Sequence, residues 1–263
     1  MARQRQLMKE LIDSAARLTA ADQAYQEGDI LVASRIFITV ARERPPTPLS
    51  RRAKQRLESL VNEAHTKLNE IDTRLRETAA EYSDSELLGM NGPTPGRWKE
   101  TVTSAFGEYD ELCQRYAAVP RTGRKLKAHV AGQRKRPEHA AVLNEPQAAA
   151  LCDVARQHEQ QQQACCAYWA YHEAAQLIPA PSARRAAEQV ARMTADPQLM
   201  EAALACRQLQ ECHRWYQRAE SVMPTWPERA EELLAQIIDT APADSEIHRA
   251  ARERIQAIRD RAH

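Results

Sequence analysis

The stretch ASRIFITVARERPP, from Ala33 to Pro46, decides the fold that this sequence predicts. Its apolar residues Ala33, Phe37 and Val40 are spaced by four and then three positions, so they share one stripe of an α-helix. The small residue lets a neighbouring helix approach closely, and the larger residues fill the space beside it. Pro45 cannot continue the helix. The stretch therefore predicts a helix that packs through a narrow seam and ends at a proline.

The same pattern recurs twice later in the chain, at the same distances from a proline. The matching residues are Ala167, Tyr171 and Ala174 before Pro179, and Ala230, Leu234 and Ile237 before Pro242. A second small-then-apolar set follows each proline, at Ala53, Leu57 and Leu60, at Ala186, Val190 and Met193, and at Ala251, Ile255 and Ile258. Each unit therefore reads as helix, proline turn, helix. Such recurrence is typical of stacked helical arrays.

Composition favours an all-α fold. Only 7 of the 263 residues are glycine and 5% are aromatic. Good helix formers dominate the sequence, and stretches alternating at period two are hard to find. A chain of this length is ample for a buried core.

The first unit resembles the tetratricopeptide repeat. The residues that carry the resemblance are Ala24, Tyr25, Gly28, Asp29, Ala33, Phe37 and Pro45. The other two units keep only the second-helix half of the pattern, with Gln162 and Thr225 where the first unit has Gly28. The resemblance implies antiparallel helix pairs stacked as a short α-solenoid.

In tetratricopeptide-like arrays, a groove takes up a peptide or a helix of a protein partner. By that resemblance we place four residues at or near the groove: Tyr25, Arg156, Glu159 and Trp215. Ordinary packing or solvent exposure is the alternative for each, and core packing fits Trp215 at least as well. A self-assembling role also agrees with the pattern, because the end helices of an array expose apolar edges unless they are capped.

The chain divides into four expected segments. Residues 1–89 hold the first helix pair and a long helix of roughly 45 Å that follows Thr47-Pro48. Its apolar stripe recurs near every 3.6 residues, and we interpret its opposite, charged face as facing solvent. Residues 90–97, MNGPTPGR, read as a hinge. Residues 98–145 hold a helix and a basic segment, and residues 146–263 hold the C-terminal repeats, with helices expected to open at Pro146, Pro197 and Pro227.

Motifs for catalysis are missing from the sequence. It has no phosphate loop, dinucleotide fingerprint or nucleophile elbow. HEQQQ at His158 and HEAAQ at His172 each lack the second histidine of a zinc-protease helix. The six cysteines show no tight C-x₂-C spacing, so we interpret them as packing residues. We therefore expect a non-enzymatic protein without a metal or cofactor.

Charge is uneven along the chain. The net charge is +1, yet eight Lys or Arg residues and no acid lie between Glu111 and Glu138. Seven of them form the basic segment: Arg121, Arg124, Lys125, Lys127, Arg134, Lys135 and Arg136. This segment is expected as a loop or a short helix. It either contacts phosphates or an acidic partner, or is simply solvated; the lack of interleaved aromatic residues favours solvation.

Two hypotheses of function follow. The first is a protein–protein interaction scaffold that binds a peptide or helix, and the second is nucleic-acid or acidic-partner binding through residues 121–136.

No stretch approaches the length of apolar sequence that a membrane helix needs, and the N-terminus lacks the apolar run of a signal peptide. With unpaired cysteine spacings, these features predict a cytoplasmic, reduced protein.

Overall fold

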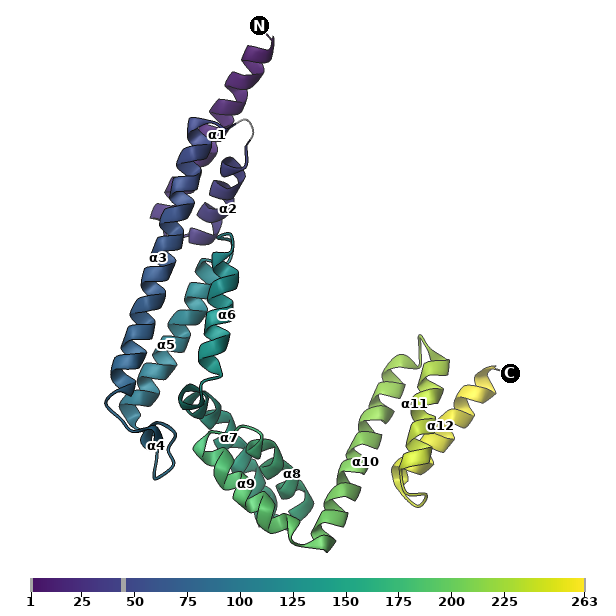
Figure 1. Cartoon of the computed structure of the whole chain (residues 1–263). Helices are drawn as coiled ribbons and strands as arrows, with labels where there is room; N and C mark the ends of the chain where they lie inside the picture. Colours follow the sequence, from purple (N-terminus) through teal and green to yellow (C-terminus); the bar gives the residue numbers. More distant parts are fainter. Residues whose placement is uncertain (1, 44–45, 263) are drawn as a thin grey trace. The chain divides into compact units, whose positions relative to one another are not determined.

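The computed structural model describes residues 2–43 and 46–262, which form twelve α-helices and no β-strand (Figure 1). The chain divides into two compact units. The first comprises residues 1–146 and 178–181, and the second comprises residues 147–177 and 182–263. The expected all-α fold is confirmed. The residues 90–97, expected as a hinge, all lie inside the first unit.

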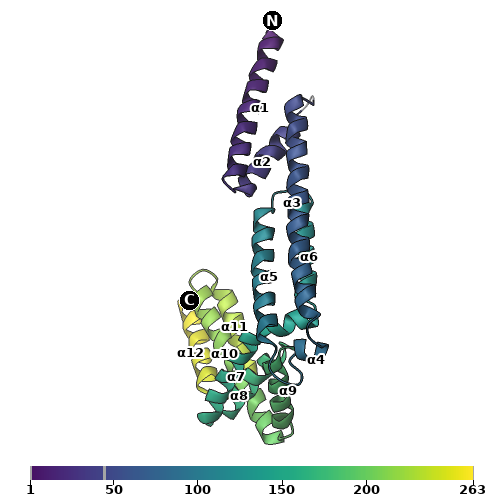
Figure 2. The same ribbon diagram turned by 90° about the vertical axis from the view of Figure 1, so that its left-hand side faces the viewer.

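The first unit is built around one long helix. Its helices are α1 (Ala2–Gln26), α2 (Ile30–Ala41), α3 (Pro48–Ala79), α4 (Asp84–Leu87), α5 (Gly96–Arg115) and α6 (Thr122–Arg134), and it also holds the first part of α7 (Pro137–Gln160). One half of α3 packs with α1 and α2, and the other half with α5 and α6 (Figures 1 and 2). The 32 residues of α3 span about 48 Å.

Local sequence explains where α2 and α3 begin. Gly28 has a positive φ of 86°, which suits glycine, and Asp29 caps α2 by accepting a hydrogen bond from the backbone N–H of Val32. Thr47 caps α3, and Pro48 occupies its first turn as expected. The last residue that we expected in α2, Arg44, and the closing Pro45 lie outside the described residues.

The small residue of each of the three matching stretches is buried. Ala33, Ala167 and Ala230 are each 0% exposed. The second small residues, Ala53, Ala186 and Ala251, are also buried. The first set lies in an apolar cluster that joins α1, α2 and α3 with Leu112 of α5 and Leu126 of α6. Residues of the second and third sets lie in clusters of α7–α9 and of α10–α12. The repeated spacing therefore predicted the buried small residues, whereas Leu57, Val190, Met193 and Ile258 are only partly buried.

A polar network fixes α6 against α3 and α5. The Tyr109 hydroxyl on α5 donates a hydrogen bond to Asp72 on α3. Nε2 of His129 on α6 lies 3.1 Å from the same carboxylate oxygen of Asp72. Leu126 and Val130 bury the inner face of α6 beside this network. The basic segment, expected as a loop or a short helix, is therefore an ordered helix.

The second unit comprises the rest of α7 and five further helices. They are α8 (Ala164–Ala175), α9 (Pro181–Thr194, whose first residue belongs to the first unit), α10 (Pro197–Val222), α11 (Pro227–Thr240) and α12 (Glu246–Ala262). The openings at Pro197 and Pro227 are as expected, and Asp196 caps α10. The opening expected at Pro146 is wrong, because α7 begins at Pro137 and contains Pro146. Proline is favoured in a first turn, and the single hydrogen bond that Pro146 removes does not end the helix.

Candidate functional site

A groove lies between α3 and α5 in the first unit. Its lining residues are Lys67, Glu70, Ile71 and Arg74 from α3, and Glu108, Glu111, Leu112 and Arg115 from α5. On both helices the lining residues are spaced by three or four positions, so one face of each helix turns toward the groove. The groove encloses about 320 Å³. Part of the charged face of α3, which we expected to be only solvated, therefore lines a concave surface.

The floor of this groove is apolar and its rim is charged. Ile71 and Leu112 are each only 5% exposed. Arg74 bridges the helices through Nη2, which donates to Oε1 of Glu108 at 2.5 Å. Glu111 and Arg115 are exposed and make no ion pair within the described residues. The rim thus offers charges of both signs to a partner.

Tyr25 lies next to one end of the groove. Its hydroxyl donates to Oε2 of Glu63 at 3.2 Å, and Oε1 of Glu63 lies 3.5 Å from Nζ of Lys67, which lines the groove. Burial, and then the Glu63 carboxylate, raises the pKa of the Tyr25 phenol. Tyr25 is 36% exposed, so part of its ring stays accessible.

The other three residues assigned by the tetratricopeptide resemblance lie in the second unit. Arg156 is exposed and pairs with Asp153 on its own helix, α7. Glu159 accepts a hydrogen bond of 3.0 Å from the hydroxyl of Tyr171 on α8. Burial, and then this hydrogen bond to the Glu159 carboxylate, raises the pKa of Tyr171 to about 12. Trp215 packs against the apolar cluster of α10, α11 and α12. Glu159 and Trp215 thus have structural contacts of their own.

The basic segment presents its cations outward from α6 and the residues flanking it. All seven are exposed: Arg121, Arg124, Lys125, Lys127, Arg134, Lys135 and Arg136. Arg134 pairs with Asp110 at 2.8 Å and stacks over the Phe106 ring, and Arg136 pairs with Glu138 at 2.7 Å. The remaining five make no ion pair within residues 2–43 and 46–262. We call these five residues, Arg121, Arg124, Lys125, Lys127 and Lys135, the free cations of α6.

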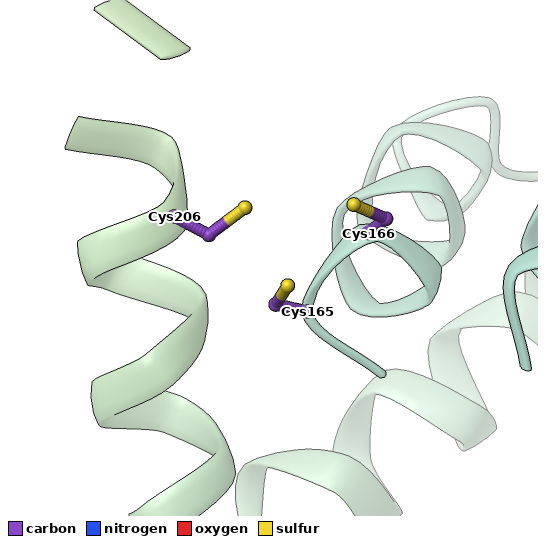
Figure 3. A group of neighbouring side chains, drawn as sticks. All are labelled: Cys165, Cys166 and Cys206. Atoms are coloured by element: carbon purple, nitrogen blue, oxygen red, sulfur yellow. The ribbon is translucent and has the colours of Figure 1, made fainter. Parts of the chain in front are cut away.

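Three cysteines gather between α8 and α10 in the second unit. Cys165 and Cys166 occupy the first turn of α8, and Cys206 lies on α10. Figure 3 shows the three side chains directed toward one another, and their Sγ atoms all lie within 4.8 Å of one another. Burial raises the pKa of the Cys166 thiol. Burial, and then hydrogen bonding to the neighbouring thiols, raises the pKa of Cys206 to about 12.

Sequence reasoning missed this cluster because its members are some forty residues apart along the chain. The sequence spacing led us to interpret all six cysteines as packing residues. The structure shows that Cys165, Cys166 and Cys206 are half-buried, whereas Cys212 is buried in the core. The adjacent pair Cys165-Cys166 was the one local signal that pointed to the cluster.

No protein-family model, curated protein or solved structure matches this chain. None of the described helices combines the length and the apolarity needed to cross a bilayer.

Proposed function

We propose that this protein is a non-catalytic, tetratricopeptide-like helical scaffold that binds a segment of a protein partner in the groove between α3 and α5. The observation that carries the proposal is the groove itself, with an apolar floor at Ile71 and Leu112 and a rim of mixed charge. The buried alanine seams support helix pairs that stack as in tetratricopeptide arrays. Six free cysteines agree with a reducing compartment such as the cytoplasm.

The rim indicates what kind of segment would fit. Glu70 and Glu111 are exposed acids, and Arg115 is an exposed cation, and none of them has an ion pair in the described structure. An apolar side chain of the partner would cover the floor, while a Lys or Arg meets the acids and a carboxylate meets Arg115. Such complementary charges fix register and partner choice more than they add affinity.

Site-specific photo-crosslinking tests this groove in the native cell. A photo-reactive amino acid at position 70 lies on the rim, and the same residue at position 54 lies on the exposed part of α3 away from the groove lining. We expect one protein to crosslink from position 70 and not from position 54. Equal capture from both positions would argue against the groove.

Charge reversal then tests the captured partner in purified form. We expect Glu111→Lys combined with Arg115→Glu to weaken its affinity by about tenfold or more, which corresponds to about 1.4 kcal/mol. Lys54→Glu is the matched control on α3, and it should bind as the wild type does. A partner that binds the double variant with unchanged affinity does not use this groove.

The outward face of α6 supports a second candidate function, binding of double-stranded nucleic acid through its phosphates. The free cations of α6 face solvent with no acid on the same helix. Three small residues, Ala128, Ala131 and Gly132, are exposed on this helix as well, so the backbone of a duplex can approach closely. Because α6 has no aromatic side chain for stacking on bases, contacts to backbone phosphates are the expected mode.

Salt dependence tests this second function. Five phosphate contacts predict that log K falls against log salt with a slope near −4.5, from about −0.9 for each contact. Fluorescence anisotropy with a labelled duplex measures the slope, and replacing Lys125 by Gln should reduce its magnitude by about 1. Arg35→Gln, an exposed cation on α2, is the control. A slope that Lys125→Gln leaves unchanged would exclude α6 as the contact surface.

A further inference from the structure

We propose that Cys165, Cys166 and Cys206 form a three-sulfur site for the soft monovalent ion Cu(I). This inference concerns the second unit and is independent of the partner groove proposed above. Cys165 and Cys166 supply two ligands from the first turn of α8, and Cys206 supplies the third from the facing side of α10 (Figure 3).

The distances fit a metal ion better than a disulfide. A metal–thiolate bond is about 2.3 Å long, so three sulfurs around a central ion form a triangle with edges of about 4.0 Å. The sulfurs here lie within 4.8 Å of one another, so no edge has to shorten by more than about 0.8 Å. A disulfide requires two sulfurs to approach to about 2.05 Å, and all three cysteines are free in this structure.

The donor set selects a soft ion. All three donors are sulfur, and no His, Asp or Glu of the described chain joins the group. Thiolates favour Cu(I) and Zn²⁺, but structural zinc is almost always held by four ligands. Cu(I) has a filled d shell and accepts three sulfurs in a trigonal plane, so these three ligands complete its coordination.

The surroundings hold the two helices together and offset negative charge. Nε1 of Trp169 on α8 donates to the backbone carbonyl of Ala203 on α10 at 2.8 Å, less than one turn before Cys206. Arg207, next to Cys206, stacks over the Trp169 ring at 4.4 Å while also pairing with Glu211. The N-terminus of α8 carries a positive partial charge beside the two cysteines of its first turn. This helix N-terminus offsets part of the net charge of −2 that three thiolates and one Cu(I) carry.

Binding follows from simple proton exchange. A cysteine thiol ordinarily keeps its proton at neutral pH, so each ligand gives up a proton when it binds the ion. Three S–H bonds break, three Cu–S bonds form, and the thiol protons leave to solvent. The oxidation state of copper and sulfur does not change. Cu(I) affinity should therefore rise with pH.

Anaerobic titration of the reduced full-length chain with Cu(I) in competition with a colorimetric Cu(I) chelator tests the site. We expect one Cu(I) per chain, an ultraviolet thiolate-to-copper charge-transfer band, and three sulfur neighbours in X-ray absorption. Cys165→Ser, Cys166→Ser and Cys206→Ser should each weaken binding by more than about 100-fold, since even the loss of a group that only supports a ligand costs 10–100-fold. Cys113→Ser in the first unit is the matched control and should bind as the wild type does.

Each other result overturns the proposal. Wild-type affinity in any one of the three variants would show that its sulfur is not a ligand. Failure of the wild-type chain to retain copper against the chelator would show that no such site exists. A disulfide between Cys206 and Cys165 or Cys166 that persists in reducing buffer, detected by mass, would show that the cluster stores an oxidised pair. Circular dichroism checks that each variant folds, and the matching Cys→Ala variant replaces any Ser variant that does not.

Discussion

Ala33→Leu tests the packing seam on which the fold depends. Ala33 is 0% exposed and belongs to one cluster with Leu18 and Ala21 of α1 and with Ala53 of α3. Leucine has three more carbon atoms than alanine, and the helices around Ala33 already cover its side chain completely. Overpacking of this kind costs about 1–3 kcal/mol, because side chains leave their preferred rotamers and helices move apart.

Hydrogen exchange read by mass spectrometry measures this cost locally. A loss of about 2 kcal/mol corresponds to roughly a 30-fold faster exchange of the backbone amides of α2. The matched control is Val32→Leu, which introduces the same side chain at the preceding position, where the side chain is 40% exposed. A surface change of this kind should stay within about 0.5 kcal/mol, or about twofold in exchange. If the two variants exchange at the same rate, Ala33 does not form a tight seam and the packing argument fails.

Three further changes probe the first unit. Tyr109→Phe removes the hydrogen bond to half-buried Asp72 and should lower the free energy of unfolding by about 1–3 kcal/mol in urea titrations; unchanged stability would show that the network contributes nothing. Burial lowers the pKa of His139 below its ordinary 6.5. As pH drops, His139 is therefore protonated in the unfolded chain before it is protonated in the folded one, so the free energy of unfolding should fall below pH 6.5. His139→Gln should flatten that fall and exposed His65→Gln should not, as thermal melts across this pH range can show. Thr47→Ala removes the cap of α3 and should cost about 1 kcal/mol, with a smaller loss counting against the capping geometry.

Local patterns in the sequence determined the helices and most of their buried faces. The spacing of Ala33, Phe37 and Val40 was enough to predict a buried stripe, because side chains three or four positions apart share a helix face. Asp196 before Pro197 predicted the start of α10, because an N-cap residue bonds to backbone N–H groups within the first turn of its own helix. These features depend only on residues that are close along the chain.

The tertiary structure decided which surfaces could bind. The charged face of α3 became one wall of a groove only because α5 packs beside it, and Leu126 and Val130 made a helix of the basic segment by packing on that pair. Pro146 remained inside α7, since residues on both of its sides pack in helical form.

The cluster of three cysteines separates most clearly what local sequence determined from what only tertiary packing decided. The adjacent cysteines 165 and 166 were visible in the sequence, but their partner, Cys206, stands forty residues further along on another helix. Neither spacing nor composition relates residues so far apart, because the packing of α8 on α10 sets the distance between them. The sequence therefore determined that this chain folds as packed helices, and only the packing brought three sulfurs to within reach of one ion.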